Sequence, residues 1–172
     1  MNSFATVRSV AAWLAQSQAT MAIQSHAWVI PTIQSIHIVT IAVALGSVWM
    51  VTMRVLGLAS RDVSLADVSA RFTPWLTASL PVLLATGVLM IIGEPTRELL
   101  ALSFWIKMFL LLIGISTAAG LRRSLRTHQE GETPGMRAIA IATLMIWLSI
   151  VVFGRLIAYD HVWGSWSAAL KG

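Results

Sequence analysis

The chain contains no cysteine among its 172 residues. Without cysteine it can form neither a disulfide framework nor an iron–sulfur cluster nor a thiolate metal site. Covalent attachment of a c-type haem through a CxxCH motif is excluded for the same reason. Any metal or haem site in this chain must therefore do without thiolate ligands.

Charged residues are also scarce, making up 11% of the chain against 57% hydrophobic residues. Soluble domains contain about 25% charged residues, and a water-soluble fold could not cover its surface with so few. The formal net charge of +5 does not indicate nucleic-acid binding, because the basic residues gather in loops between apolar segments. The composition therefore predicts an integral membrane protein.

Four apolar segments are long enough to cross the core of a bilayer, which is about 30 Å thick and takes roughly 20 helical residues. Charged or turn-forming residues bound each segment. Lipid offers no hydrogen-bond partner to the backbone, so these segments are expected to be helices. We predict an all-α fold, a four-helix transmembrane bundle with spans at residues 30–53, 74–92, 102–121 and 137–159.

The first 28 residues differ from the rest of the chain. Apolar residues recur there at helical spacing, while polar residues occupy the other positions of the helical wheel. We expect residues 1–28 to form an amphipathic helix on the membrane surface, and residues 29–172 to form the transmembrane domain. The apolar positions of this segment are Phe4, Val7, Val10, Ala11 and Leu14.

The distribution of arginine predicts the orientation. The loops after the first and third spans are rich in arginine, and the positive-inside rule places such loops in the cytoplasm. Both termini then lie on the outer side, which in a bacterial inner membrane is the periplasm. The arginines of these two loops are Arg54, Arg61, Arg71, Arg122, Arg123, Arg126 and Arg137.

His37 is the most informative residue, because ionisable groups inside spans are rare and mark functional sites. It lies roughly 10 Å into the first span, at 1.5 Å per residue. Gln34 and Thr40 share its helix face, with Ala44 further along. This polar stripe is expected to face the bundle interior, where Gln34 could fix the imidazole tautomer. His37 is a candidate haem ligand, metal ligand or proton-handling group; alternatively it bonds a neighbouring helix for packing specificity.

Two cations lie just inside the predicted spans, on the same side of the membrane as His37. Lys107 lies about five residues into the third span, and Arg155 lies about one turn before the end of the fourth. Either side chain could extend to the headgroups. Together, near a buried histidine, they also suit an anionic group such as a haem propionate, a quinone oxygen or a lipid phosphate.

A haem with two histidine ligands needs a second axial residue. His161 and His26 are the candidates on that side, whereas His128 belongs to the opposite loop. Both candidates are predicted at the membrane surface rather than within a span. His161 is also the second candidate metal ligand beside His37. The chain has no HExxH motif, phosphate-binding loop or GxSxG motif, so the sequence assigns no enzymatic activity.

Several short motifs, taken in order, resemble a family of bacterial four-helix inner-membrane proteins catalogued as a domain of unknown function. Met53 stands where the family pattern is more polar. The resemblance covers most of the chain and implies the fold and the membrane location, but no activity. A more distant likeness links the layout to small membrane cytochromes b and copper-resistance D-type proteins. The segments that carry the family resemblance are 28–37, Gly46, 53–57, Pro81, Thr86-Gly87, Glu94-Pro95, 104–108 and 154–159.

The leading hypothesis is a haem-b-binding or quinone-interacting electron-transfer protein, with His37 as ligand and with Lys107 and Arg155 beside anionic groups. One alternative is a non-catalytic subunit that anchors a larger membrane or periplasmic assembly. Another is a small metal or solute permease. The expected partners are the lipid bilayer and other protein subunits or further copies of the chain, with no nucleic acid.

Overall fold

The computed structural model describes residues 3–60, 62–127 and 134–159. These residues form helices joined by short turns, with no strand in the described ranges, which confirms the predicted all-α fold. The helices are α1 (Ser3–Ala15), α2 (Gln18–Gln24), α3 (Val29–Val55), α4 (Leu65–Gly93), α5 (Pro95–Leu99), α6 (Leu102–Thr127) and α7 (Pro134–Ile157).

Four of these helices, α3, α4, α6 and α7, are long and apolar enough to cross a membrane. The four predicted spans are thereby confirmed as helices, and the chain has the form of a multi-pass membrane protein. Large apolar side chains project outward from these helices, each with more than half of its surface exposed, as lipid-facing residues would. Examples are Ile38, Leu84, Phe109, Leu112 and Val152.

Helix α4 begins at Leu65, well before the span expected from residue 74. Ser64 caps this helix: its Oγ accepts the backbone N–H of Asp67 at 3.0 Å and donates to the Asp67 carboxylate at 2.6 Å. A serine cap of this kind satisfies one of the free N–H groups at the helix start. Pro74 and Pro81 lie inside α4, as transmembrane helices tolerate.

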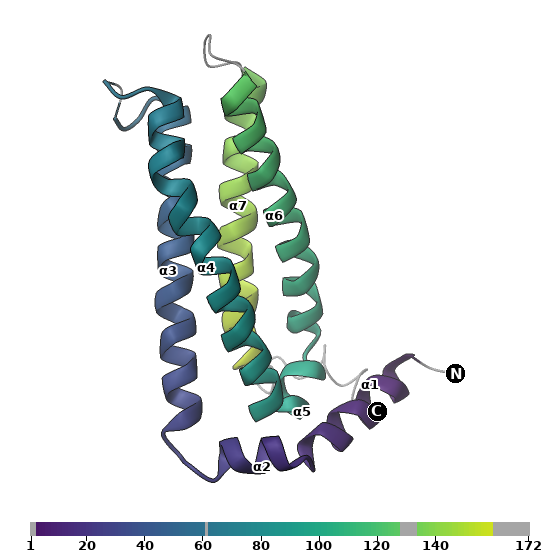
Figure 1. Cartoon of the computed structure of the whole chain (residues 1–172). Helices are drawn as coiled ribbons and strands as arrows, with labels where there is room; N and C mark the ends of the chain where they lie inside the picture. The colour runs from purple at the N-terminus through teal and green to yellow at the C-terminus, as the bar shows by residue number, and fades with distance from the viewer. Residues whose placement is uncertain (1–2, 61, 128–133, 160–172) are drawn as a thin grey trace.

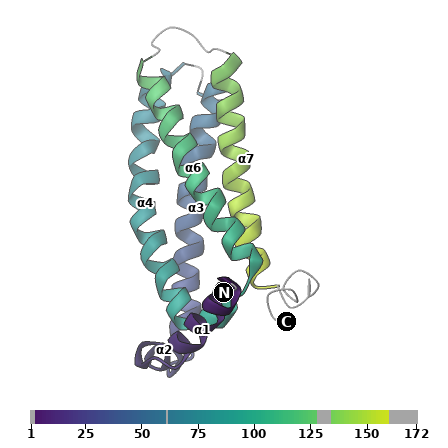
Figure 2. The same cartoon turned by 90° about the vertical axis from the view of Figure 1, so that its right-hand side faces the viewer.

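The long helices pair as two antiparallel hairpins, α3 with α4 and α6 with α7, and α3 packs against α7 (Figures 1 and 2). Three clusters of buried apolar residues fill the bundle. The first holds Val55, Leu121, Met136 and Ala140, the second Ala44, Val48, Leu144 and Trp147, and the third Ala101, Phe104 and Ile157.

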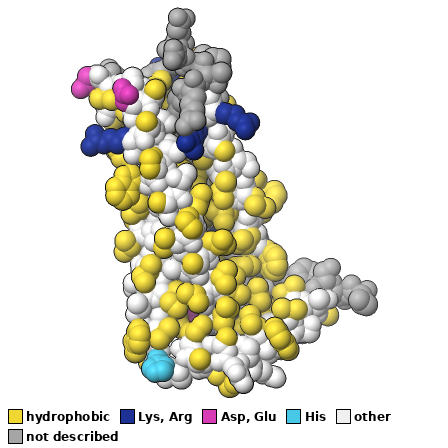
Figure 3. Space-filling view, in the orientation of Figure 1, with side chains coloured by type: hydrophobic (Ala, Val, Ile, Leu, Met, Phe, Trp, Pro, Cys, Tyr) yellow, Lys and Arg dark blue, Asp and Glu magenta, His cyan; other side chains and the backbone are white. Residues whose placement is uncertain are grey.

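Arginines gather at the end of the bundle where α3 and α6 finish and α4 and α7 begin, here called the arginine end. Figure 3 shows basic and acidic side chains at this end, and a largely apolar surface along the helices below it. Both arginine-rich connections thus lie on one side of the bundle, as the predicted topology requires. The described arginines of this end are Arg54, Arg71, Arg122, Arg123 and Arg137.

Helices α1, α2 and α5 lie across the opposite end, here called the α5 end (Figures 1 and 2). The predicted N-terminal helix is present, but it is divided in two at Ser17, which caps α2 by accepting the N–H of Thr20. Thr20 is fully buried, and its hydroxyl lies 2.7 Å from the carbonyl oxygens of Leu14 and Ile92.

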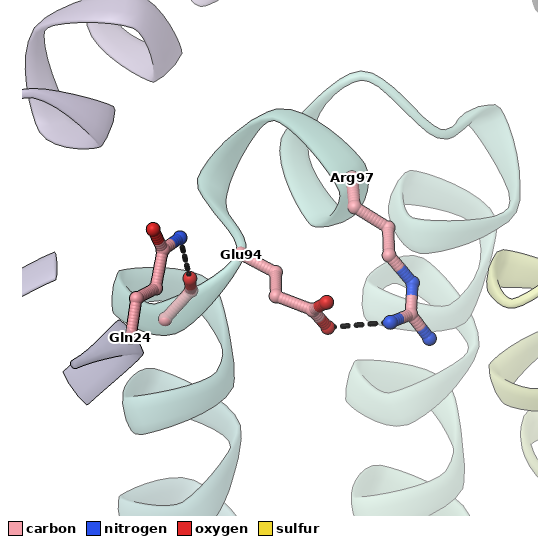
Figure 4. Close-up of polar contacts among 4 residues, drawn as sticks. Gln24, Glu94 and Arg97 are labelled. Atoms are coloured by element: carbon pink, nitrogen blue, oxygen red, sulfur yellow. Dashed lines mark hydrogen bonds and ion pairs between the residues drawn. The ribbon is translucent and has the colours of Figure 1, made fainter. Parts of the chain in front are cut away.

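Gln24 adds a second bond to the end of α4. Its Nε2 donates to the carbonyl of Gly93 at 2.7 Å, the contact drawn in Figure 4. A methyl group on Gly93 would lie only 3.2 Å from Ile23 Cγ2, so this glycine lets α2 pack closely. The last carbonyls of α4, which no helical N–H reaches, are therefore satisfied by α2.

Candidate functional site

His37 lies in the third turn of α3, in the half of the bundle nearer the α5 end. Its side chain is half-buried, and Ala44, two turns further along the same face, is fully buried. The prediction that this face of α3 points into the bundle is therefore confirmed. A histidine at this depth needs partners from neighbouring helices.

Thr86 of α4 supplies that partner, because its Oγ1 lies 2.7 Å from Nδ1 of His37. The single hydroxyl proton of Thr86 is directed to the carbonyl of Val82, also at 2.7 Å. With the Thr86 proton on that carbonyl, Thr86 accepts from His37 and Nδ1 carries the proton, which is the tautomer that we assign to the ring. This arrangement leaves the Nε2 lone pair of the neutral imidazole as the acceptor or ligand atom.

The sequence suggested that Gln34 could fix the tautomer, but the partner of Nδ1 in the structure is a different residue. The residue bonded to Nδ1 is Thr86, on the adjacent helix. Gln34 shares the face of His37 at i−3 and is half-buried. The imidazole reaches across to α4 rather than back along its own helix.

Gly87, the next residue of α4, borders the imidazole ring. A methyl group on Gly87 would lie 3.8 Å from Cε1 of His37, the ring carbon between the two nitrogens. Gly87 itself places no side chain against this edge of the ring. A flat ligand bound at Nε2 would need such room, which a larger side chain would fill.

Lys107 of α6 brings a third helix to the site. Its charge acts on His37, and its half-buried stem packs against α7, where a methyl group on Gly154 would lie 3.5 Å from Cδ. The structure thus brings together two residues that the sequence had singled out, His37 and Lys107. A lysine ammonium beside a neutral histidine suits an anionic oxygen.

Ser103 lies one turn before Lys107 on the same face of α6. Its Oγ is buried and has no hydrogen-bond partner within the described residues. Serines within a helix commonly bond the carbonyl four residues earlier, which for Ser103 is that of Leu99. Leu99 lies before the first residue of α6, Leu102, and its carbonyl accepts from the Trp105 indole at 3.1 Å instead. A buried hydroxyl left in this state is a free donor beside Lys107.

Glu98 of α5 is the residue that the sequence interpretation missed. It is only 3% exposed, and its charge interacts with that of Lys107. Burial raises the pKa of the Glu98 carboxyl above its ordinary value, and Lys107 and Arg97 partly oppose that rise. Its sequence neighbours Arg97 and Glu94 instead form an ion pair with each other (Figure 4).

The remaining candidates lie apart from this group. Arg155 is exposed near the end of α7, where it donates to the Tyr159 hydroxyl at 3.0 Å and lies over the Tyr159 ring. His26 is exposed before α3 and bonds Ser25 through Nδ1 at 2.8 Å. His161 lies outside the described residues.

No group of three or more histidine, aspartate or glutamate side chains converges within the described ranges. The described site therefore offers one nitrogen ligand, one cation, one free hydroxyl donor and one buried acid. Such a set matches a cofactor held by a single axial histidine and by polar contacts to its acidic groups better than a metal ion enclosed by several protein ligands.

Comparison with known proteins identifies a family to which the chain belongs, but no individual relative. No curated protein matches the chain, and no solved structure does. The model of one family, described as a family of unknown function (DUF6644), matches residues 12–160. That match includes His37, Thr86, Glu98, Ser103 and Lys107. The chain is therefore a member of the DUF6644 family of unknown function.

Proposed function

We propose that this protein is an electron-transfer protein that binds haem b within the membrane, with Nε2 of His37 as an axial ligand. The single observation that carries the proposal is the bond from Nδ1 of His37 to Thr86. Metal-ligating histidines donate their other N–H in this way, which fixes the tautomer and orients the ring.

Three features of the donor set support haem over a bare metal ion. Gly87 leaves one side of the imidazole free of side chain. Lys107 offers a cation from which a carboxylate of the haem would accept a hydrogen bond, and the unpaired hydroxyl of Ser103 lies one turn away on the same face of α6. The half-buried positions of His37 and Lys107 lower the local dielectric constant, which strengthens contacts to a charged group.

Haem b supplies a one-electron carrier when bound. The tasks of this chain are then to ligate, to orient and to balance charge. His37 provides the ligand atom, Thr86 holds the ring in place, and Lys107 compensates negative charge. His161 is our candidate for the second axial position, because His26 is engaged with Ser25 at the surface.

Titration of haem into the purified, haem-free protein tests the proposal. We expect saturable binding with a shifted Soret band in the wild type and its loss in His37→Ala. The matched control is His26→Ala, which removes an exposed histidine and should bind normally. Binding that survives in a folded His37→Ala variant would overturn the assignment, and a changed band position in His161→Ala would identify the second ligand.

We also propose that the arginine end faces the cytoplasm of a bacterial cell, with the protein in the inner membrane. The positive-inside rule is the reason. The lack of native cysteine makes the test clean, because Ala59→Cys and Ser25→Cys would each introduce a single thiol at opposite ends of α3. An impermeant maleimide added to the outside of intact cells should label Ser25→Cys alone; labelling of Ala59→Cys alone would reverse the topology.

A second candidate function, a membrane subunit of a larger assembly, is favoured by the outer face of α6. Ser116 and Gly120, one turn apart, are both exposed, and a methyl group on Gly120 would meet nothing within 4 Å. Small residues spaced in this way let another helix approach closely. Co-purification of a partner that is lost in Gly120→Leu but retained in Gly46→Leu, an exposed glycine of α3, would support this role.

A further inference from the structure

A buried acid near the haem-binding group has no role in the proposal above. Glu98 lies in the short helix α5, which packs against α1, α4 and α6 at the α5 end of the bundle. Its side chain is 3% exposed, while its neighbour Glu94 is more exposed and paired with Arg97. No hydrogen bond or ion pair of the Glu98 carboxyl is found among the described residues, and because its oxygens are not among the fully enclosed unpaired polar atoms, they keep a narrow contact with the surface.

A buried carboxylate without such partners is costly, and the usual escape is to bind a proton. The charges that act on Glu98 are those of Lys107 on α6, and of Arg97 and Glu94 on its own segment. The other elements that pack against α5 add little at this end: α1 carries Arg8, and the charged residues of α4, Asp67 and Arg71, lie at the arginine end. Burial outweighs the two cations, so the Glu98 pKa is raised.

We propose that Glu98 is a proton-binding site that controls how strongly Lys107 holds an anionic ligand. The inference rests on the proposed haem site and extends it. When Glu98 carries a proton it is neutral, and the charge of Lys107 is available to a carboxylate of the haem. When Glu98 releases its proton to water, the new carboxylate competes for Lys107 and repels the ligand. Proton binding and anion binding therefore favour each other, and by linkage the effect is reciprocal.

The pH dependence of haem affinity follows from the charge of Glu98. Haem affinity is high at pH values below the raised pKa of Glu98 and falls as the pH rises through it. Coupling between two such sites is typically on the order of tenfold. Glu98→Gln keeps the shape and stays neutral, so this variant should hold haem at the low-pH affinity throughout.

Infrared spectroscopy of the full-length haem-free protein tests the proton site without relying on haem. We expect the wild type and Glu94→Gln to show a carboxylic-acid C=O band that persists above the pH range in which an exposed glutamate ionises, and we expect Glu98→Gln to lack this band. In Lys107→Met the band should persist to still higher pH, because the cation that favours ionisation is gone. A wild-type acid band that disappears over the same pH range as that of an exposed glutamate, or one that Glu98→Gln leaves unchanged, would overturn the proton site.

Haem titrations across pH then test the linkage. The wild type should lose affinity by roughly tenfold as the acid band disappears, and Glu98→Gln should show no such loss. Equal pH dependence in the two proteins would overturn the linkage while leaving the haem site intact. Failure of haem to bind at any pH would overturn the proposed function and the ligand half of this inference, and the infrared result would still decide the proton site.

Discussion

Nδ1 of His37 lies 2.7 Å from the hydroxyl oxygen of Thr86, and the proton of that hydroxyl is already directed to the carbonyl of Val82. Two helices of one hairpin thus hold the imidazole between them, and we assign its proton to Nδ1. The ring presents Nε2 as a lone pair inside a bundle whose outer surface is apolar. Because Nδ1 is engaged with Thr86, Nε2 of His37 is the candidate ligand atom.

Thr86→Val removes the acceptor while keeping the shape of the side chain. We expect haem affinity to fall roughly 10- to 100-fold, the usual effect of losing the partner of a ligating histidine. Thr143→Val is the matched control, since Thr143 is also buried and bonds the carbonyl of residue Ile139. Equal affinities in the wild type and a folded Thr86→Val protein, measured by haem titration, would contradict the role given to Thr86.

Gly87→Leu should block haem binding by placing a side chain beside the His37 ring. A single methyl group would only reach van der Waals contact at 3.8 Å, so Gly87→Ala should bind more weakly but measurably. Gly46→Leu makes the same change at an exposed position of α3 where a methyl group meets nothing, and it should bind normally. Normal binding in Gly87→Leu would show that this side of the ring is not part of the site.

Lys107→Met should weaken haem binding by removing the cation opposite its carboxylates, and Lys107→Arg should restore much of the loss. The comparison variant is Arg155→Met, because Arg155 is exposed and engaged with Tyr159. A smaller effect in Arg155→Met than in Lys107→Met is the expected order in haem titrations. Comparable losses in the two variants would favour the sequence interpretation, in which both cations serve the site, and a larger loss in Arg155→Met would contradict the role given to Lys107.

Thr20→Val should loosen α2 from the end of α4. Thr20 is fully buried and bonds backbone carbonyls, so losing its hydroxyl leaves a buried acceptor unsatisfied and should cost about 1–3 kcal/mol. Thermal unfolding in detergent measures the loss, with Gln18→Ala, an exposed residue of α2, as the control. A Thr20→Val protein as stable as the wild type would mean that α2 is held by its apolar contacts alone.

The spans and the inward face of α3 were predictable because composition and helical periodicity act locally. An apolar run must be a helix in lipid, and residues three and four apart share a face. These rules placed His37 inside the bundle and Lys107 on the same side of the membrane. They also predicted an N-terminal surface helix, although they did not predict the serine cap that divides this helix in two at Ser17.

The partners of His37 were not predictable in the same way. Thr86 lies 49 residues further along the chain, and its contact depends on how far α4 slides along α3, which hydropathy does not specify. Glu98 belongs to the connection between the second and third predicted spans, for which hydropathy predicts no packing. Its burial arises from the packing of α1 and α6 around α5, a tertiary effect.

The absorption spectrum of gently solubilised protein, expressed with haem supplied and recorded oxidised and dithionite-reduced, tests the central claim most directly. If His37 binds haem b, we expect a Soret band with sharp α and β bands on reduction, all absent from a folded His37→Ala protein. A featureless visible spectrum from well-folded wild-type protein, or one unchanged in His37→Ala, would contradict it and leave His37 bonded to Thr86 for packing alone.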